Sequence, residues 1–255
     1  MTSHPTLTDG LQAETFLTEG TPIDTKKVSP VGDLIAKENL DVAKDLKPAV
    51  ASYYSLGGRL WSMPLNSSAP VMYFDKAAFR QAGLDPEKRI WTYGELATAA
   101  KKLTKKDADG KIVRAGLGFT LDSIAALRGY LKSDTDAGKG VEVATAYLPR
   151  PKGAKGGVII GGASLWITSS GSTEQQAGAW DFVKLTSEPE IQAFFSSNRG
   201  YYPTRNAAYA QPLMKEALAK FAQFQVAVDE LRATLAAGAT QGTVFGTFVK
   251  ARGNV

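Results

Sequence analysis

Short apolar runs alternate along the chain with segments whose apolar residues recur at helical spacing. The strand-like runs are Val71–Phe74, Val141–Tyr147 and Val158–Ile167, and the last of these contains Gly161 and Gly162, which predict a kink. No repeat at a solenoid period is present. The alternation predicts an α/β fold.

Capping residues mark where several helices are expected to begin. Asp75 precedes a helix expected to run to Leu84, and Thr92 with Glu95 has the spacing of a capping box that opens a helix to about Lys106. Thr120-Leu121-Asp122-Ser123 supplies capping groups for a helix over Ile124–Leu131.

The C-terminal third is expected to be mostly helical. Two further capping boxes, Thr173-Glu174-Gln175-Gln176 and Ser187-Glu188-Pro189-Glu190, predict helices at about 174–186 and 188–197. A long helical region is expected over about 212–237, where Phe221, Phe224 and Val228 form a stripe that faces the core. A short helix is expected at 243–251.

Composition places the chain among folded globular proteins. Of its 255 residues 44% are hydrophobic and 22% are charged, and the longest apolar runs fall far short of the roughly 20 residues that a membrane span needs. The net charge of +5 comes from scattered residues, and the Lys101–Lys106 run reads as a solvated helix end. We therefore expect no nucleic-acid partner.

The inventory of reactive side chains excludes several classes of enzyme. The chain has no cysteine, and its single histidine, His4, lies in a polar leader expected over residues 1–13. Catalysis by Ser-His-Asp or Cys-His groups and zinc sites with two or more imidazoles are therefore excluded. The leader has neither a basic stretch nor an apolar core, so no secretory signal is expected in this chain.

Four phrases of the sequence resemble the extracytoplasmic solute-binding proteins of ABC sugar importers, in particular the branch that binds sn-glycerol 3-phosphate and glycerophosphodiesters. The phrases are Pro64–Pro86, Ile160–Trp166, Gly200–Pro203 and Val226–Leu231. The first two are long and ordered enough to be specific.

The resemblance implies a type II periplasmic-binding-protein fold, in which two α/β lobes joined by a hinge close on a solute. It divides the chain into the leader, a first-lobe remnant with crossover at 14–115, a second-lobe remnant with strand return at 116–168, and a C-terminal helical part at 169–255. It also implies a monomer that binds a small solute without catalysis or a cofactor, docks on a membrane permease and works in the periplasm or elsewhere outside the cytoplasmic membrane.

When the phrases are matched residue by residue, the resemblance assigns the ligand contacts of the family to residues of this chain. These fall at Ser68, with Asn66 and Ser67 of the same loop, and at Thr120, Gly162 and Tyr201. Hydroxyls, an exposed backbone N–H and a tyrosine ring suit sugar or phosphate oxygens and an apolar sugar face. The acidic contact of the family falls at Glu19, although the glutamate is displaced by one position. The arginine that pairs with the phosphate in the family is replaced here by Gln225, a neutral amide.

Other interpretations remain open at this point. Ser68 can be a turn residue, Thr120 a helix cap, Gly162 a strand kink and Tyr201 a core residue. The first βαβ segment of the family and a stretch near Gly116–Thr120 have no counterpart here, so the chain can also be a truncated scaffold that binds no solute, or an interaction protein. A glycosidase that uses two carboxylates, for instance Asp122 and Glu142, is a further alternative without a supporting motif.

Overall fold

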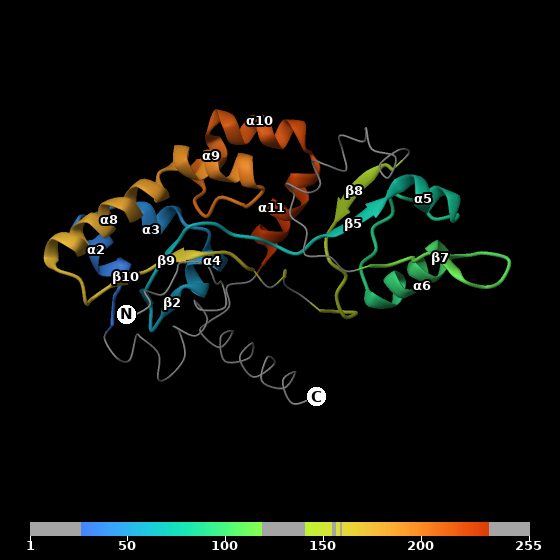
Figure 1. Ribbon diagram of the computed structural model, residues 1–255, viewed down its shortest axis with the longest axis horizontal. Coiled ribbons are helices and arrows are strands. Elements are labelled where there is room, and N and C mark those ends of the chain that lie inside the picture. The colour runs from blue at the N-terminus through green and yellow to red at the C-terminus, as the bar shows by residue number, and fades with distance from the viewer. Residues whose placement is uncertain (1–26, 119–140, 155–156, 159, 235–255) are drawn as a thin grey trace. The chain divides into compact units, whose positions relative to one another are not determined.

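The computed structural model describes residues 27–118, 141–154, 157–158 and 160–234, which group into two compact units (Figure 1). Unit 1 contains the described parts of residues 1–68, 159–217 and 234–255, and unit 2 contains those of 69–158 and 218–233. Both units mix helices and short strands. These units are defined by contacts within the chain, which is a different division from the lobes of the family. The lobe boundaries implied by the resemblance therefore remain predictions.

Unit 1 holds three antiparallel strand pairs in its described part. They are β1 (Val28–Ser29) with β10 (Ile167–Thr168), β2 (Ser55–Leu56) with β3 (Arg59–Leu60), and β4 (Met63–Pro64) with β9 (Ser164–Leu165). Two of these pairs join the segment before Asn66 to the segment after Gly162. The predicted strand over Val158–Ile167 is thus confirmed in its second half only.

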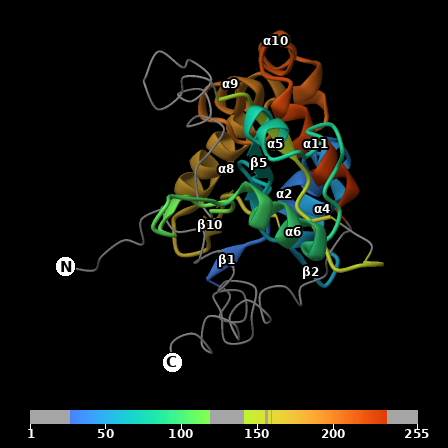
Figure 2. The ribbon, with the colours of Figure 1, turned by 90° about the vertical axis from the view of Figure 1, so that its right-hand side faces the viewer.

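The described helices of unit 1 are α2 (Val31–Lys37), α3 (Val42–Asp45), α4 (Pro48–Tyr53), α8 (Thr173–Ser187), α9 (Pro189–Arg199) and the 3₁₀ turn η1 (Ala207–Ala210). The helix α10 (Pro212–Lys220) begins in this unit and crosses its boundary at residue 217. The consecutive helices α8 and α9 pack against each other (Figures 1 and 2).

The capping boxes of α8 and α9 differ from the prediction. The box that opens α8 is formed by Ser172 and Gln175, one residue earlier than expected, because Ser172 is the residue whose backbone lies outside the helix. At α9 the predicted box is wrong, since Ser187 belongs to the end of α8 and its hydroxyl donates to the backbone oxygen of Lys184. Pro189 begins α9 instead, as a residue without an N–H suits the first turn.

Apolar side chains from both long described segments of unit 1, 27–68 and 160–217, contribute to its core. Val31, Val50, Met214 and Ala193 are fully buried, and Ile167 is 2% exposed. At the edge of this core the indole of Trp180 donates a 2.8 Å hydrogen bond to Glu38. Burial of this apolar surface is the main stabilising contribution to the unit.

Unit 2 is built on the antiparallel pair of β5 (Met72–Asp75) and β8 (Val143–Ala146), which lie side by side in Figure 1. The helix α5 (Lys76–Gln81) follows β5 directly, and the Asp75 carboxylate accepts a hydrogen bond from the Ala77 N–H. The predicted strands and the cap at Asp75 are therefore confirmed. The helix ends three residues before Leu84, where Gly83 adopts a φ of +67°.

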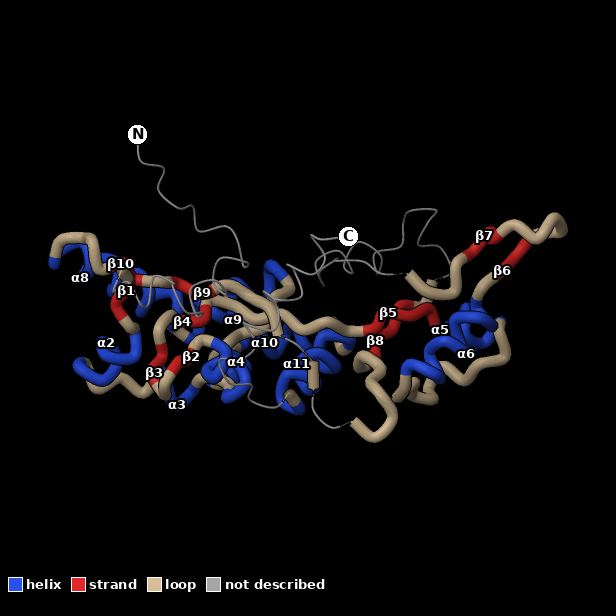
Figure 3. The backbone as a smooth tube through the Cα atoms, turned by 90° about the horizontal axis from the view of Figure 1, so that it is seen from below, coloured by secondary structure: helices blue, strands red, loops and turns tan. Residues whose placement is uncertain are grey.

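The helix α6 (Tyr93–Leu103) begins with the predicted capping box of Thr92 and Glu95. It ends before Lys106, because Lys105–Lys106 form β6, which pairs with β7 (Ile112–Arg114) in a hairpin (Figure 3). The expectation of a helix through the whole lysine run is wrong in its last part. Both strand lysines are exposed, as expected for a charged edge.

The predicted long C-terminal helix is two helices, α10 and α11 (Gln223–Ala233). In unit 2, α11 packs against β8, and the hydroxyl of Thr145 donates a 3.0 Å hydrogen bond to the backbone oxygen of Gln223. Phe224 and Val228 are 2% and 0% exposed, which confirms them as core residues, whereas Phe221 is only half-buried.

Three predicted elements lie outside the described residues: the leader, the helix over 124–131 and the helix over 243–251. Among the residues that are described, no helix has the length and apolar character that a membrane span requires.

Candidate functional site

Three of the phrases singled out in the sequence come together in unit 1. The loop Asn66–Ser68 is bonded on one side to residues 161–163 and on the other to Tyr202. Ser67 exchanges two backbone hydrogen bonds with Tyr202, of 3.0 and 2.8 Å. Ser68 exchanges two more with Gly161, of 2.9 and 3.0 Å. The loop therefore bridges two segments that lie about 95 and 135 residues further along the chain.

Two of the predicted contact residues use their side chains to hold this arrangement. The Asn66 Oδ1 atom accepts a 3.0 Å hydrogen bond from the Ala163 N–H, and the Ser67 hydroxyl donates to the Gly161 backbone oxygen over 3.4 Å. Both residues are buried, at 6% and 1% exposure. Their side chains thus support the loop, whereas that of Ser68 remains half-buried.

Gly162 occupies a position that other residues cannot take without strain. Its φ is +144°, and a Cβ atom placed there would lie 2.2 Å from the Asn66 backbone oxygen. A side chain at this residue would therefore push the loop away from the returning segment. The predicted kink at Gly162 is present, and the same glycine permits the close approach of two backbones.

Tyr201 extends from the end of α9 and is 38% exposed, so the reading of it as a core residue is wrong. The buried residue of the pair is Tyr202, at 3% exposure. The ring of Tyr201 lies parallel to that of Phe195, with centroids 6.1 Å apart and an interplanar angle of 17°. Gly200, with a φ of +79°, ends α9 and directs the chain from the helix to these two tyrosines.

A buried polar network holds the residue that precedes the loop. The side-chain nitrogen of Gln192 donates to the backbone oxygens of Leu65 and Thr186, over 2.7 and 2.9 Å. Its oxygen accepts from the N–H and the hydroxyl of Thr204, and that hydroxyl also reaches the Pro64 backbone oxygen. No sequence signal identifies Gln192, because a glutamine on a helix is usually exposed.

The remaining predicted contacts lie in unit 2 or outside the described residues. Gln225 belongs to unit 2, where its side-chain nitrogen donates to Asp229 over 2.8 Å. Thr120 and Glu19 lie outside the described residues. Glu142, one of the carboxylates considered for catalysis, forms an ion pair with Arg80, and its proposed partner Asp122 is not described either. Within the described ranges, no group of three or more His, Cys, Asp or Glu side chains could hold a metal ion.

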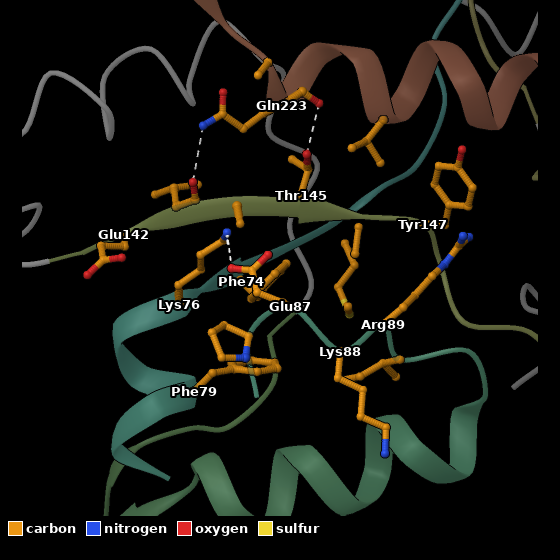
Figure 4. Close-up of a pocket in the computed structure, with 18 of the residues that line it drawn as sticks. Phe74, Lys76, Phe79, Glu87, Lys88, Arg89, Glu142, Thr145, Tyr147 and Gln223 are labelled. Atoms are coloured by element: carbon orange, nitrogen blue, oxygen red, sulfur yellow. Dashed lines mark hydrogen bonds and ion pairs between the residues drawn. The ribbon is translucent and has the colours of Figure 1, made fainter. Parts of the chain in front are cut away.

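Unit 2 contains a pocket of about 700 Å³ (Figure 4). It is bounded by β5, the start of α5, the loop over 86–90, residues 141–147 and one face of α11. Figure 4 shows Thr145 and Gln223 joined by a hydrogen bond above the β8 strand, and Lys76 paired with Glu87 below it. The volume falls in the range of small-molecule sites.

Two family models match the chain, and both describe a bacterial extracellular solute-binding protein. One matches residues 16–135 and the other residues 118–222, so together they span 16–222.

Curated relatives include the sn-glycerol-3-phosphate-binding periplasmic protein UgpB of Yersinia pestis and that of Escherichia coli K12. They are 27% and 26% identical to this chain, and each alignment covers 74% of the chain and 60% of the relative. The chain thus spans about three fifths of the length of these relatives.

Solved structures with the same fold include UgpB from Mycobacterium tuberculosis in complex with glycerophosphocholine, with a TM-score of 0.64 and 21% identity over 84% of this chain and 69% of that one. The sugar-binding protein MalE from Xanthomonas citri superposes with a TM-score of 0.65 and 17% identity, over 87% and 70% of the two chains. These likenesses confirm the predicted fold class, that of the type II periplasmic binding proteins.

Proposed function

Because the chain belongs to the bacterial extracellular solute-binding proteins, we propose that it binds a sugar or a glycerol-phosphate-like solute for an ABC importer. Binding involves no catalysis in this proposal. The protein acts outside the cytoplasmic membrane, as a monomer, and passes its solute to a membrane permease.

The observation that carries the proposal is the convergence of Ser68, Gly162 and Tyr201 in unit 1. Their segments are far apart in the sequence, and paired backbone hydrogen bonds hold them together. A loop fixed in this way loses little conformational freedom when it binds a ligand, which favours affinity. The arrangement supports a role for these residues as one wall of a solute site.

The groups at this wall suit an oxygen-rich solute. The Ser68 hydroxyl can donate and accept hydrogen bonds, and the half-exposed ring of Tyr201 can cover an apolar sugar or glycerol face while its hydroxyl bonds an oxygen. Thr120, Glu19 and Gln225 stay proposed ligand contacts on the family resemblance alone. A neutral amide at Gln225 weakens the case for a strongly bound phosphate.

Isothermal titration calorimetry against glycerol 3-phosphate, glycerophosphocholine and a disaccharide panel tests the proposal. We expect saturable binding of at least one of these solutes. Tyr201→Ala and Ser68→Ala should each weaken it about tenfold, in line with the loss of one good contact.

Matched variants separate a site effect from a general one. Tyr93→Ala removes a tyrosine that is 58% exposed on α6, and Ser197→Ala removes a hydroxyl that bonds within α9. Both should leave the affinity unchanged. If circular dichroism shows a folded chain that releases no heat with any of the solutes, the protein is a scaffold without solute binding, which was the alternative left open by the sequence.

A further inference from the structure

The pocket of unit 2 is lined by both apolar and charged side chains. Met72 and Phe74 of β5 and Phe79 of α5 contribute apolar side chains to the lining, and the ring centroids of Phe74 and Phe79 are 4.8 Å apart. The lining also includes lysine, arginine and acidic side chains, several of which are labelled in Figure 4. Such a combination is typical of sites for small molecules that carry both an apolar body and a charged group.

The acidic side chains of the lining are already paired with bases. Glu87 contacts Lys76 over 2.7 Å, Glu142 pairs with Arg80, and Asp229 contacts Arg232 over 3.2 Å. The remaining charged lining residues are Lys88 and Arg89, which follow one another in the loop over 86–90. Within the described residues, neither side chain donates a hydrogen bond. The three acids and three bases of the lining balance in formal charge, but Arg80 and Arg232 pair two of the acids from outside the lining, which leaves Lys88 and Arg89 without an acidic partner in the lining.

Arg89 is held in an unusual way. Its Cζ atom lies 3.5 Å from the centroid of the Trp91 ring and 3.7 Å from that of Tyr147. These are van der Waals contact distances, so each ring must cover a different face of the planar guanidinium. Figure 4 shows the Arg89 side chain extending from its loop toward Tyr147.

The chain segments that carry the two rings are tied together. The N–H of Arg150 donates a 3.0 Å hydrogen bond to the Trp91 backbone oxygen, and the N–H of Leu148 donates to the Glu230 carboxylate over 3.1 Å. The ring pair is thus built on a connected backbone framework. With its faces covered, the guanidinium has its N–H edges left to bind a ligand.

We propose that the pocket of unit 2 is a second binding site, which holds an anionic small molecule through the edge of the Arg89 guanidinium. A carboxylate or phosphate group accepts two parallel hydrogen bonds from such an edge, and Lys88 adds a second positive charge. The apolar part of the ligand would lie on Phe74 and Phe79. The pocket belongs to unit 2 and the Ser68, Gly162 and Tyr201 cluster to unit 1, and this proposal does not depend on the function proposed for that cluster.

The charged groups that face Arg89 are consistent with this role. Burial lowers the pKa of Arg89, while Tyr147 and the α11 residue Glu230 attract its charge and Arg150 repels it. Burial also raises the pKa of Glu230 to about 7, so that near neutral pH this carboxyl is only partly ionised and only partly neutralises Arg89. An external anion would complete the neutralisation.

Tryptophan fluorescence offers a local readout, because Trp91 is the one tryptophan of unit 2 and the other three belong to unit 1. The full chain is titrated at low salt with inorganic phosphate and, separately, with citrate. We expect a saturable change in emission with at least one anion that disappears in Trp91→Phe. Phosphate alone would indicate a phosphorylated ligand, and citrate alone a carboxylate.

Arginine variants decide whether the response belongs to this site. By calorimetry Arg89→Gln should weaken anion binding about tenfold or more, and Arg89→Lys should weaken it less, because the charge is kept while the planar edge is lost. Lys102→Gln, which removes a charge from an exposed part of α6, and Tyr201→Ala in unit 1 should have no effect. Absence of saturation with both anions, or equal affinity in wild type and Arg89→Gln, would overturn the proposal.

Discussion

The side-chain nitrogen of Gln192 lies 2.7 Å from the backbone oxygen of Leu65, to which it donates a hydrogen bond. Gln192 is 2% exposed, and Leu65 directly precedes the Asn66–Ser68 loop. A helix residue 127 positions away thus holds the start of the loop in place. Because the other end of the same amide binds Thr204, the link also fixes the segment that carries Tyr201.

Replacing Gln192 should destabilise the protein. In Gln192→Ala the Leu65 oxygen and the Thr204 N–H lose their partner inside the core, which costs about 2–3 kcal/mol of the free energy of unfolding. Urea denaturation followed by circular dichroism measures this loss. Gln81→Ala, at the exposed end of α5, is the matched control and should change stability by less than about 0.5 kcal/mol. Equal effects of the two variants would contradict the role given to Gln192.

A side chain at Gly162 should disrupt the cluster. In Gly162→Ala the new methyl group meets the Asn66 oxygen, and the φ of +144° becomes strained, so we expect a loss of about 2 kcal/mol or more and weaker solute binding. Thermal unfolding and calorimetry check the two effects. Gly178→Ala, inside α8 where a Cβ atom would meet no neighbour, should instead stabilise the helix by about 0.5–1 kcal/mol.

The stability should depend on pH through Glu230. Burial raises the pKa of this carboxyl to about 7, whereas an unfolded glutamate has a pKa of about 4.3. Between these values the folded state binds the proton more tightly than the unfolded state does. The contribution of Glu230 to the free energy of unfolding is therefore fully present below about pH 4, and it is lost as the pH rises through about 7.

Glu230→Gln isolates this contribution, because an amide oxygen can still accept the hydrogen bond from Leu148 but does not titrate. On going from pH 5 to pH 8, we expect the free energy of unfolding of the variant to rise by roughly 2–4 kcal/mol relative to that of wild type. Glu190→Gln, on the exposed side of α9, should show no such difference. A pH-independent offset between wild type and Glu230→Gln would refute the assignment.

The capping box of α6 should contribute measurably to stability. Thr92→Ala removes the hydroxyl that accepts from the Glu95 N–H, at a cost of about 1 kcal/mol. Thr98→Ala, whose hydroxyl bonds the Gly94 oxygen within the same helix, is expected to change stability by no more than a few tenths of a kcal/mol. Differential scanning calorimetry on the two variants measures the difference.

Several local features could be predicted because neighbouring residues produce them. Asp75 caps α5, Thr92 and Glu95 cap α6, and Phe224 with Val228 face the core. The errors are also local in origin. Ser172 and Thr173 are both good capping residues, and the choice between them depends on where the chain leaves β10, which the residue types alone do not specify.

The sequence by itself determined the α/β class, the exclusion of histidine and cysteine chemistry, and the phrases that carry the family resemblance, because residue type, order and spacing carry these directly. The tertiary structure decided which side chains of those phrases are available to a ligand. Asn66 and Ser67 are buried and bond the backbone of the returning segment, whereas Tyr201 is exposed. The tertiary structure also placed Gln192 against Leu65 at the start of the loop, and Arg89 between Trp91 and Tyr147. Such contacts join residues far apart in the chain and follow from packing, which no local pattern encodes.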